Sequence, residues 1–173
     1  WFSGAASNGS YLSYALVQFS QASGIRLENS SASLTHLLVR KNTMSHGLEG
    51  AYYGGAGIYV GGGTPTLDHL VITDNTTGSY GGGLYLVTGT VQQVGNTVLE
   101  RNTSASGGGG IYCRDGGLRL TNAVLSQNTG GQGSGVFFQM GMQDLTLTNV
   151  LIRDNNGGGG SLYLENPNNP LAV

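Results

Sequence analysis

Short segments in which apolar and polar residues alternate recur along the chain. In one of them, Leu118, Leu120 and Asn122 alternate with Arg119 and Thr121. Alternation with period two is typical of a β-strand, and the glycine runs between the segments disfavour helices at those points. The pattern therefore predicts an all-β chain built from short strands.

The segments belong to a repeat of about 26 residues. In most copies a glycine precedes an aliphatic-aromatic-aliphatic triplet; a serine replaces the glycine in the last copy, and an arginine replaces the aromatic residue in the first. The first copy is longer, and its extra residues lie near Met44 to Tyr53. The residues that open the triplets are Gly24, Gly57, Gly83, Gly110, Gly135 and Ser161.

Two polar positions set the register of the repeat. Each copy contains an asparagine three positions after an aliphatic residue, and another polar residue lies six positions before that asparagine. This offset does not vary, so we expect a rigid strand between the two positions and turns that absorb changes in length. The asparagines are Asn42, Asn75, Asn102, Asn128 and Asn155, and the earlier polar residues are His36, His69, Asn96, Asn122 and Asn149.

A repeat of this length, with short strands that stack on the next copy, predicts a parallel β-solenoid. About six coils at a strand spacing of ~4.8 Å would form a rod ~30 Å long. We interpret residues 1–173 as one domain. In it, 1–23 form a degenerate first coil or partial cap, 24–164 form the regular coils, and 165–173 form a C-terminal tail.

Alternation places three rows of apolar side chains inside the coils. Burial of one such side chain stabilises a fold by about 1.5–3 kcal/mol. We therefore expect Leu125→Asp, in a middle coil, to disrupt the stack. The inward rows are Ile58, Leu84, Ile111, Val136 and Leu162; Val60, Leu86, Cys113, Phe138 and Leu164; and Val39, Ile72, Leu99, Leu125 and Ile152.

Stacking also brings the polar positions into columns. The five asparagines should form a ladder of amides that hydrogen-bond from coil to coil, because an unpaired buried amide costs about 1–3 kcal/mol. Binding of a polar ligand along the rod is the alternative role of this ladder. His36 and His69 share the second column, but no third histidine or cysteine lies there to complete a metal site. We therefore interpret that column as stacked polar side chains without a metal.

Two further rows should face outward. One is aromatic, and it either contacts sugar rings or another protein or packs against itself. The other is aliphatic, and two apolar rows on one rod favour lateral packing against another chain. The rows are Tyr59, Tyr85, Tyr112, Phe137 and Tyr163, and Leu38, Val71, Val98, Val124 and Leu151.

The motifs resemble those of a known family. Gly-Gly-Ala-Gly-Ile-Tyr at 54–59, Gly-Gly-Gly-Leu-Tyr at 81–85 and Gly-Gly-Gly-Ile-Tyr at 108–112 resemble the GGA[I/L/V] element of polymorphic outer-membrane protein repeats. The aliphatic-x-x-Asn segments resemble its FxxN element, with an aliphatic residue in place of phenylalanine. The broader resemblance is to right-handed, pectin-lyase-like β-helices. It implies a right-handed parallel β-helix and an extracellular or cell-surface adhesin.

Composition narrows the range of partners. Only 9% of residues are charged, and the net charge of −2 comes from 7 basic and 9 acidic residues without clusters. Without a basic stripe we expect no nucleic acid partner, and without an apolar run of about 18 residues we expect no membrane span. Cys113 is the single cysteine, so it has no internal disulfide partner. Candidate glycosylation sequons begin at Asn8, Asn29, Asn75 and Asn102.

An enzymatic function is the main alternative, since pectin-lyase-like folds also include polysaccharide lyases and hydrolases. Such sites need grouped carboxylates, whereas acidic residues are scattered here, and Asp74 with Glu100 is the best available pair. A regular threonine row for ice binding is also interrupted, by Asp68 and Gly95. We therefore expect no catalysis and no cofactor.

The expected function is a structural or adhesive module. We expect it to associate through its outward rows, or end to end into filaments, with copies of itself, other surface proteins or glycans. The alternative is a polysaccharide-binding or polysaccharide-degrading protein.

Overall fold

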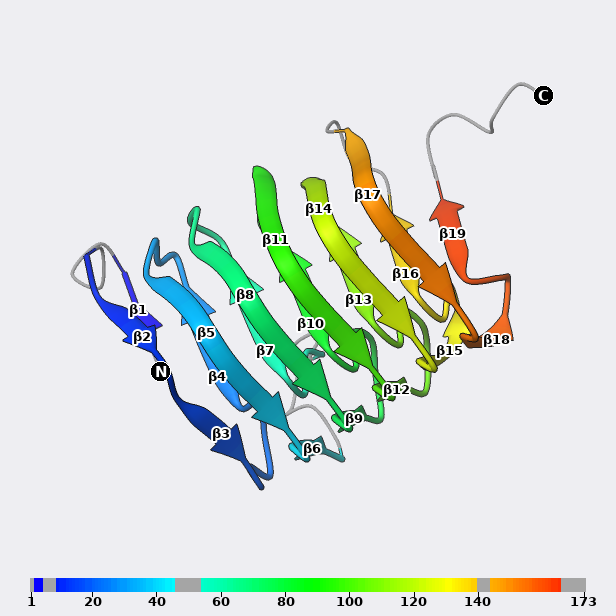
Figure 1. Ribbon diagram of the computed structural model, residues 1–173, viewed down its shortest axis with the longest axis horizontal. Coiled ribbons are helices and arrows are strands. Elements are labelled where there is room, and N and C mark those ends of the chain that lie inside the picture. Colours follow the sequence, from blue (N-terminus) through cyan, green and yellow to red (C-terminus); the bar gives the residue numbers. More distant parts are fainter. Residues whose placement is uncertain (1, 5–8, 46–53, 140–143, 166–173) are drawn as a thin grey trace.

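The chain winds into stacked coils whose strands form three parallel sheets (Figure 1). The structure is a computed structural model that describes residues 2–4, 9–45, 54–139 and 144–165. Within each sheet, neighbouring strands come from successive copies of the repeat. The prediction of a stacked, all-β parallel solenoid is confirmed. No helix in these described ranges is long and apolar enough to span a membrane.

The three sheets, which we call the aromatic, the long and the narrow sheet, differ in the length of their strands. The aromatic sheet contains β1 (Phe2–Ser3), β4 (Ile25–Glu28), β7 (Ile58–Gly61), β10 (Leu84–Val87), β13 (Ile111–Arg114), β16 (Val136–Gln139) and β19 (Leu162–Glu165). The long sheet contains β2 (Tyr11–Ser13), β3 (Leu16–Gln18), β5 (Ser33–Arg40), β8 (Thr66–Thr73), β11 (Val91–Glu100), β14 (Gly117–Ser126) and β17 (Leu145–Arg153). The narrow sheet contains β6 (Thr43–Met44), β9 (Thr76–Thr77), β12 (Thr103–Ser104), β15 (Thr129–Gln132) and β18 (Asn156–Gly158).

The strand register follows the repeat in the sequence. Tyr85 pairs with Tyr59 on one side and with Tyr112 on the other. The longer copy keeps the same register, because Ile25 pairs with Ile58. Its extra residues lie between β6 and β7, and 46–53, including His46, fall outside the described residues.

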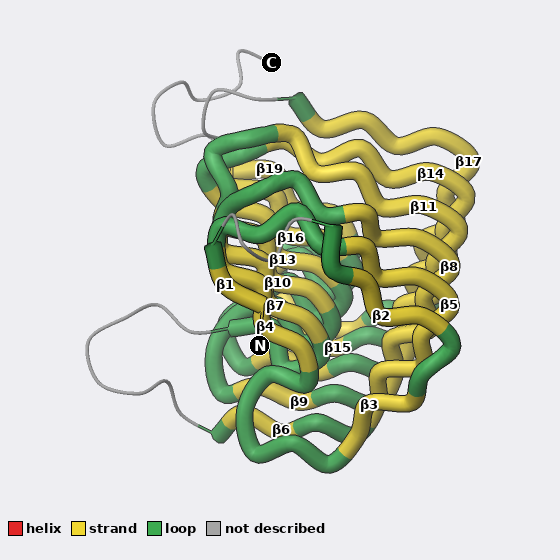
Figure 2. The backbone as a smooth tube through the Cα atoms, turned by 90° about the vertical axis from the view of Figure 1, so that its left-hand side faces the viewer, coloured by secondary structure: helices red, strands yellow, loops and turns green. Residues whose placement is uncertain are grey.

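The degenerate segment at the N-terminus also forms part of the stack. β2 and β3 lie one after the other along β5, with Leu12 paired to Leu34 and Val17 paired to Val39. Figure 2 shows how the coils follow one another along the rod. Trp1 in the expected N-terminal cap and 166–173 in the expected tail lie outside the described residues.

Two columns of residues with positive φ form corners of the coil. The first column interrupts the long strands and has φ between 48° and 54°. Asparagine and histidine adopt this left-handed conformation more readily than most residues, which explains their choice there. The second column lies immediately before the ladder asparagines, and before Ser20 in the first rung, where the chain leaves the long sheet. The first column is Tyr14, His36, His69, Asn96, Asn122 and Asn149, and the second is Phe19, Lys41, Asp74, Arg101, Gln127 and Asp154.

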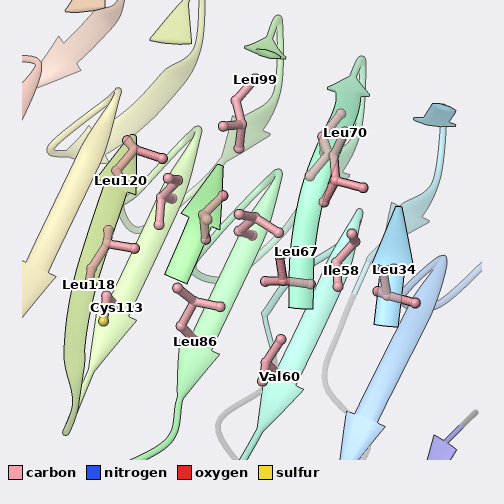
Figure 3. Close-up of a cluster of buried hydrophobic side chains, with 14 of the residues drawn as sticks. Leu34, Ile58, Val60, Leu67, Leu70, Leu86, Leu99, Cys113, Leu118 and Leu120 are labelled. Atoms are coloured by element: carbon pink, nitrogen blue, oxygen red, sulfur yellow. The ribbon is translucent and has the colours of Figure 1, made fainter. Parts of the chain in front are cut away.

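The main hydrophobic core lies between the aromatic sheet and the long sheet (Figure 3). Side chains from both sheets meet there, such as Ile58 from β7 and Leu67 from β8. The inward rows predicted from alternation are buried throughout the central coils. In the last rung, Leu162 and Leu164 remain 39% and 38% exposed, because no described coil covers them.

The aromatic row is buried, so the expectation that it is exposed was wrong. It faces away from the main core, but Tyr85, Tyr112 and Phe137 are only 1%, 3% and 2% exposed. They form a second hydrophobic cluster, against which Tyr59 and Tyr163 pack as partly buried members. Successive rings are in contact, with centroids 5.0–5.5 Å apart.

Glycine-rich loops cover this aromatic cluster. In successive copies Gly54, Tyr80, Gly107 and Gln132 pair in parallel and form a small ladder outside the rings. A Cβ at Gly54 would lie 2.2 Å from Cδ2 of Tyr85, so only glycine allows the loop to approach so closely. The glycine runs therefore allow a second layer of backbone to fold over the aromatic side chains.

Candidate functional site

A ladder of asparagines runs along the corner between the long sheet and the narrow sheet. The Nδ2 of every ladder asparagine except the last donates to Oδ1 of the ladder asparagine in the next coil, at 2.9–3.1 Å. The backbone N–H of these same four residues also donates to that oxygen, at 2.9–3.1 Å. The amides do hydrogen-bond from coil to coil, as expected. The ladder residues are Asn42, Asn75, Asn102, Asn128 and Asn155.

Hydrogen bonds within the coil stack occupy both ends of the ladder amides. Besides its bond to Asn128, Asn102 Nδ2 donates to the carbonyl of Ile72 at 2.8 Å. Its Oδ1 accepts two bonds from Asn75, and the Asn102 side chain is fully buried. This geometry supports a structural role at the turn, because no group of the amide is left for a ligand.

The same geometry corrects two of the candidate glycosylation sites. A glycan must attach to an exposed asparagine nitrogen, whereas Asn75 and Asn102 are fully buried and donate that nitrogen within the protein. Asn29 is exposed and stays a candidate. Asn8 lies outside the described residues.

The second polar column forms an exposed ladder on the outer face of the long sheet. The rings of His36 and His69 stack with centroids 4.6 Å apart, and Tyr14 stacks on His36 at the same distance. The Nδ2 of Asn96 donates to Asp68 Oδ1 at 2.8 Å. The column continues through Asn122, which donates to Asn96, and Asn149, which donates to Asn122. In the described ranges, no group of three or more His, Cys, Asp or Glu side chains could hold a metal ion.

The outward aliphatic row lies beside this ladder, two residues further along each strand. Val71 and Leu151 are 41% and 50% exposed, and Leu16 in the first rung is 50% exposed. Paired residues of adjacent strands connect these positions into one line. The complete row is Leu16, Leu38, Val71, Val98, Val124 and Leu151.

An ion-pair cluster occupies the far end of the long strands. Arg101 binds Asp74 of the preceding coil through Nε, at 2.8 Å, and through Nη2, at 3.1 Å. It also contacts Glu100 and donates to Thr73 Oγ1 at 2.9 Å. The hydrogen bonds from Arg101 lower the pKa of the Asp74 carboxyl. The best candidate pair of catalytic carboxylates is thus engaged by one arginine.

The match to a known family agrees with this geometry. Residues 4–172 match the model of a family described as the right-handed β-helix region. The chain belongs to the right-handed β-helix family. No curated protein and no solved structure matches the chain. The ladders, the aliphatic row and the ion-pair cluster all lie within the matched residues.

The outer face of the long sheet is the candidate functional surface of this β-helix. It carries the exposed polar ladder, the aliphatic row and the charged side chains, whereas the aromatic row lies beneath glycine loops. One feature of the sequence could have indicated that loops cover the aromatic row. A glycine-rich stretch of several residues precedes most of the aromatic triplets. A run without side chains is what a close backbone approach to a ring requires.

Proposed function

We propose that this β-helix is a non-enzymatic, extracellular structural or adhesive module. Its contact surface is the aliphatic row on the outer face of the long sheet. The occupant of that surface is a second copy of the chain or another surface protein. The polysaccharide-degrading alternative is less well supported, because Asp74 and Glu100 both bind Arg101.

The observation that carries the proposal is the continuity of this row. Single exposed apolar residues are ordinary on protein surfaces, whereas an apolar line with one exposed or half-buried member in every rung is not. Six rungs spaced by ~4.8 Å give a line of about 24 Å. The exposed polar ladder on one side supplies the polar rim that protein interfaces have around their apolar centre.

Exposed apolar side chains also support association at the end of the rod. Leu162 and Leu164 occupy core columns, yet both are more than a third exposed. Their exposure supports stacking of a further coil on that rung. Lateral contact through the aliphatic row and stacking at the ends would together build filaments.

Sedimentation velocity over a range of concentrations tests the lateral contact. We expect the wild type to associate as concentration rises and Val71→Asp to remain monomeric, because a charge would then have to be desolvated in the contact. Thr76→Asp, at an exposed position of the narrow sheet, is the control and should associate like the wild type. A wild type that stays monomeric and binds no cell-surface protein would overturn the proposal. Turnover of any polysaccharide would overturn its non-enzymatic part.

A further inference from the structure

The outer face of the long sheet also has a polar groove, on the other side of the positive-φ column from the aliphatic row. The groove has a volume of about 370 Å³ and crosses β11, β14 and β17. Its polar side chains are neutral except for one arginine. They come from Gln93, Arg119, Thr121, Thr146 and Thr148, and Gly95 lines the groove with backbone alone.

Strand pairing arranges these residues as a small grid. Arg119 pairs with Gln93 on one side and with Thr146 on the other. Two residues further along the strand, Gly95, Thr121 and Thr148 form the parallel column. Side chains two residues apart on a strand share a face, so the two columns flank one groove. Gly95 contributes no side chain, and the Asp68 carboxylate of the adjacent strand takes the space beside it, because a Cβ at Gly95 would lie 2.8 Å from Asp68 Oδ1.

Arg119 differs from the other arginines of the described residues. Those at 26, 101, 114 and 153 contact carboxylates, and Arg40 donates to Gln18 at 2.9 Å. Within the described ranges Arg119 is exposed and has no acidic or amide partner. A guanidinium presents a planar fork of donors that matches an oxyanion, so this groove has a free anion-binding group.

We propose that the groove binds a saccharide through a single oxyanion group, a carboxylate or a sulfate. Arg119 binds the oxyanion. The hydroxyls of Thr121, Thr146 and Thr148, with the Gln93 amide, exchange hydrogen bonds with the sugar hydroxyls. This site lies apart from the aliphatic row, so the inference goes beyond the function proposed above.

The charge around the groove favours a ligand with one anionic group over a polyanion. Asp68 pairs with Gly95, and a Cβ at Gly95 would lie 2.8 Å from Asp68 Oδ1. This carboxylate therefore lies at the edge of the groove, two strands away from Arg119. A second anionic group placed along the rod would approach Asp68 and be repelled. A nucleic acid or a uniformly sulfated chain fits this pattern poorly.

Calorimetric titration with three trisaccharides of equal length tests the site. One carries a single glucuronic acid, one carries a single sulfate, and one is neutral. We expect one or both acidic probes to bind and the neutral probe to bind at least about tenfold more weakly, since hydrogen bonds to charged groups are the stronger ones. The carboxylate and sulfate probes show which oxyanion the groove prefers.

Two arginine variants distinguish binding in the groove from a general effect of the protein's charge on acidic probes. Arg119→Gln should weaken binding of the acidic probe about tenfold or more, whereas Arg153→Gln, an exposed arginine elsewhere on the long sheet, should not. The thermal unfolding of each variant confirms that it folds. The proposal is overturned if the acidic probes fail to bind, if Arg153→Gln weakens binding equally, or if the neutral probe binds as well.

One additional variant keeps the two proposals distinguishable. Val71→Asp alters the aliphatic row and should leave titration with the acidic probe unchanged. Loss of association in this variant with retained saccharide binding supports both sites. Loss of saccharide binding in this variant would contradict the assignment to a separate groove.

Discussion

At the scale of single residues, the buried and the exposed asparagine ladders differ in how much their hydrogen bonds stabilise the fold. Asn102 is fully buried and all its amide groups are bonded, whereas Asn122 makes its ladder contact at the surface. The same substitution in the two ladders therefore separates a structural hydrogen bond from a solvated one.

Asn102→Ala should lower the free energy of unfolding by about 1–3 kcal/mol or more, because it leaves Asn75 and Asn128 without their partners in the interior. Asn122→Ala should cost less, about 0.5–1 kcal/mol, because its ladder bond is solvated and the main loss is that alanine tolerates the φ of 53° less well than asparagine does. Urea unfolding of both variants measures the difference. Equal effects would contradict a structural role for the buried ladder.

The buried tyrosines predict how stability depends on alkaline pH. Burial raises the pKa of Tyr85 to about 12, from an ordinary value of 10.0. A group whose pKa is raised on folding contributes its full stability below the unfolded pKa, and that contribution is lost as pH rises from about 10 to about 12. Unfolding followed between pH 9 and 12 should therefore show falling stability that is less steep in Tyr85→Phe. Tyr14→Phe, at a position 80% exposed, should follow the wild type. A Tyr85→Phe curve with the wild-type slope would contradict the burial of this row.

At the scale of elements, the loops that cover the aromatic cluster can need glycine for two separate reasons. One is a positive φ, and the other is the lack of space for a Cβ. Gly81 has a φ of +65°, and a Cβ there would lie 2.5 Å from the carbonyl oxygen of Leu84 and 2.9 Å from Cβ of Tyr85. Gly89 has nearly the same φ, +62°, yet its Cβ would meet only the carbonyl oxygen of Asp115, at 3.7 Å. The two positions share backbone strain and differ in crowding.

Gly89→Ala should cost about 1–2 kcal/mol, the usual cost of a left-handed conformation for a residue with a Cβ. Gly81→Ala should cost clearly more, because the loop must also move away from Tyr85. Thermal unfolding of the two variants measures the difference. If they are equally destabilised, the loop does not pack tightly on the aromatic cluster.

The elements that could be predicted from sequence are those governed by periodicity. Alternation placed residues such as Leu99 and Leu125 inside, and the constant six-residue offset predicted the asparagine ladder. The burial of Tyr85 and Tyr112 could not be predicted in this way. Alternation states which face of a sheet a side chain occupies, but not whether another segment covers that face.

Other features of the surface depended on conformation rather than on pattern. His69 and Asn96 lie at a bend with positive φ, so the residue before each also faces outward and the simple alternation fails there. The groove beside Arg119 depends on pairing across three strands, and Gly95 contributes to it by lacking a side chain. In the sequence, the same glycine was visible only as an interruption of a threonine column.

At the scale of the whole molecule, each coil of a solenoid is stabilised by its neighbours. Leu125 is completely buried in a middle coil, with Leu99 and Ile152 at the paired positions of the adjacent strands. Leu125→Asp should lower the free energy of unfolding by about 4 kcal/mol or more, because it places an unpaired charge in the core. Leu151→Asp, at an exposed position of the adjacent strand, should have a small effect. Urea unfolding that ranks the two variants in the opposite order would contradict the inward assignment.

Stacking of successive copies in register is the claim on which the ladders, the rows and the groove all depend. Val98 and Val124 are paired on adjacent strands, and Val71 lies one strand further away. Paired Cα atoms at a strand spacing of ~4.8 Å are within the range that a disulfide can bridge, whereas atoms two spacings apart are not.

Disulfide formation between engineered cysteines tests this claim most directly. In a Cys113→Ala background at low protein concentration, the pair Val98→Cys and Val124→Cys should oxidise to an intramolecular disulfide. The pair Val71→Cys and Val124→Cys should remain reduced. Failure of the first pair to oxidise, or equally ready oxidation of the second, would contradict the stacking.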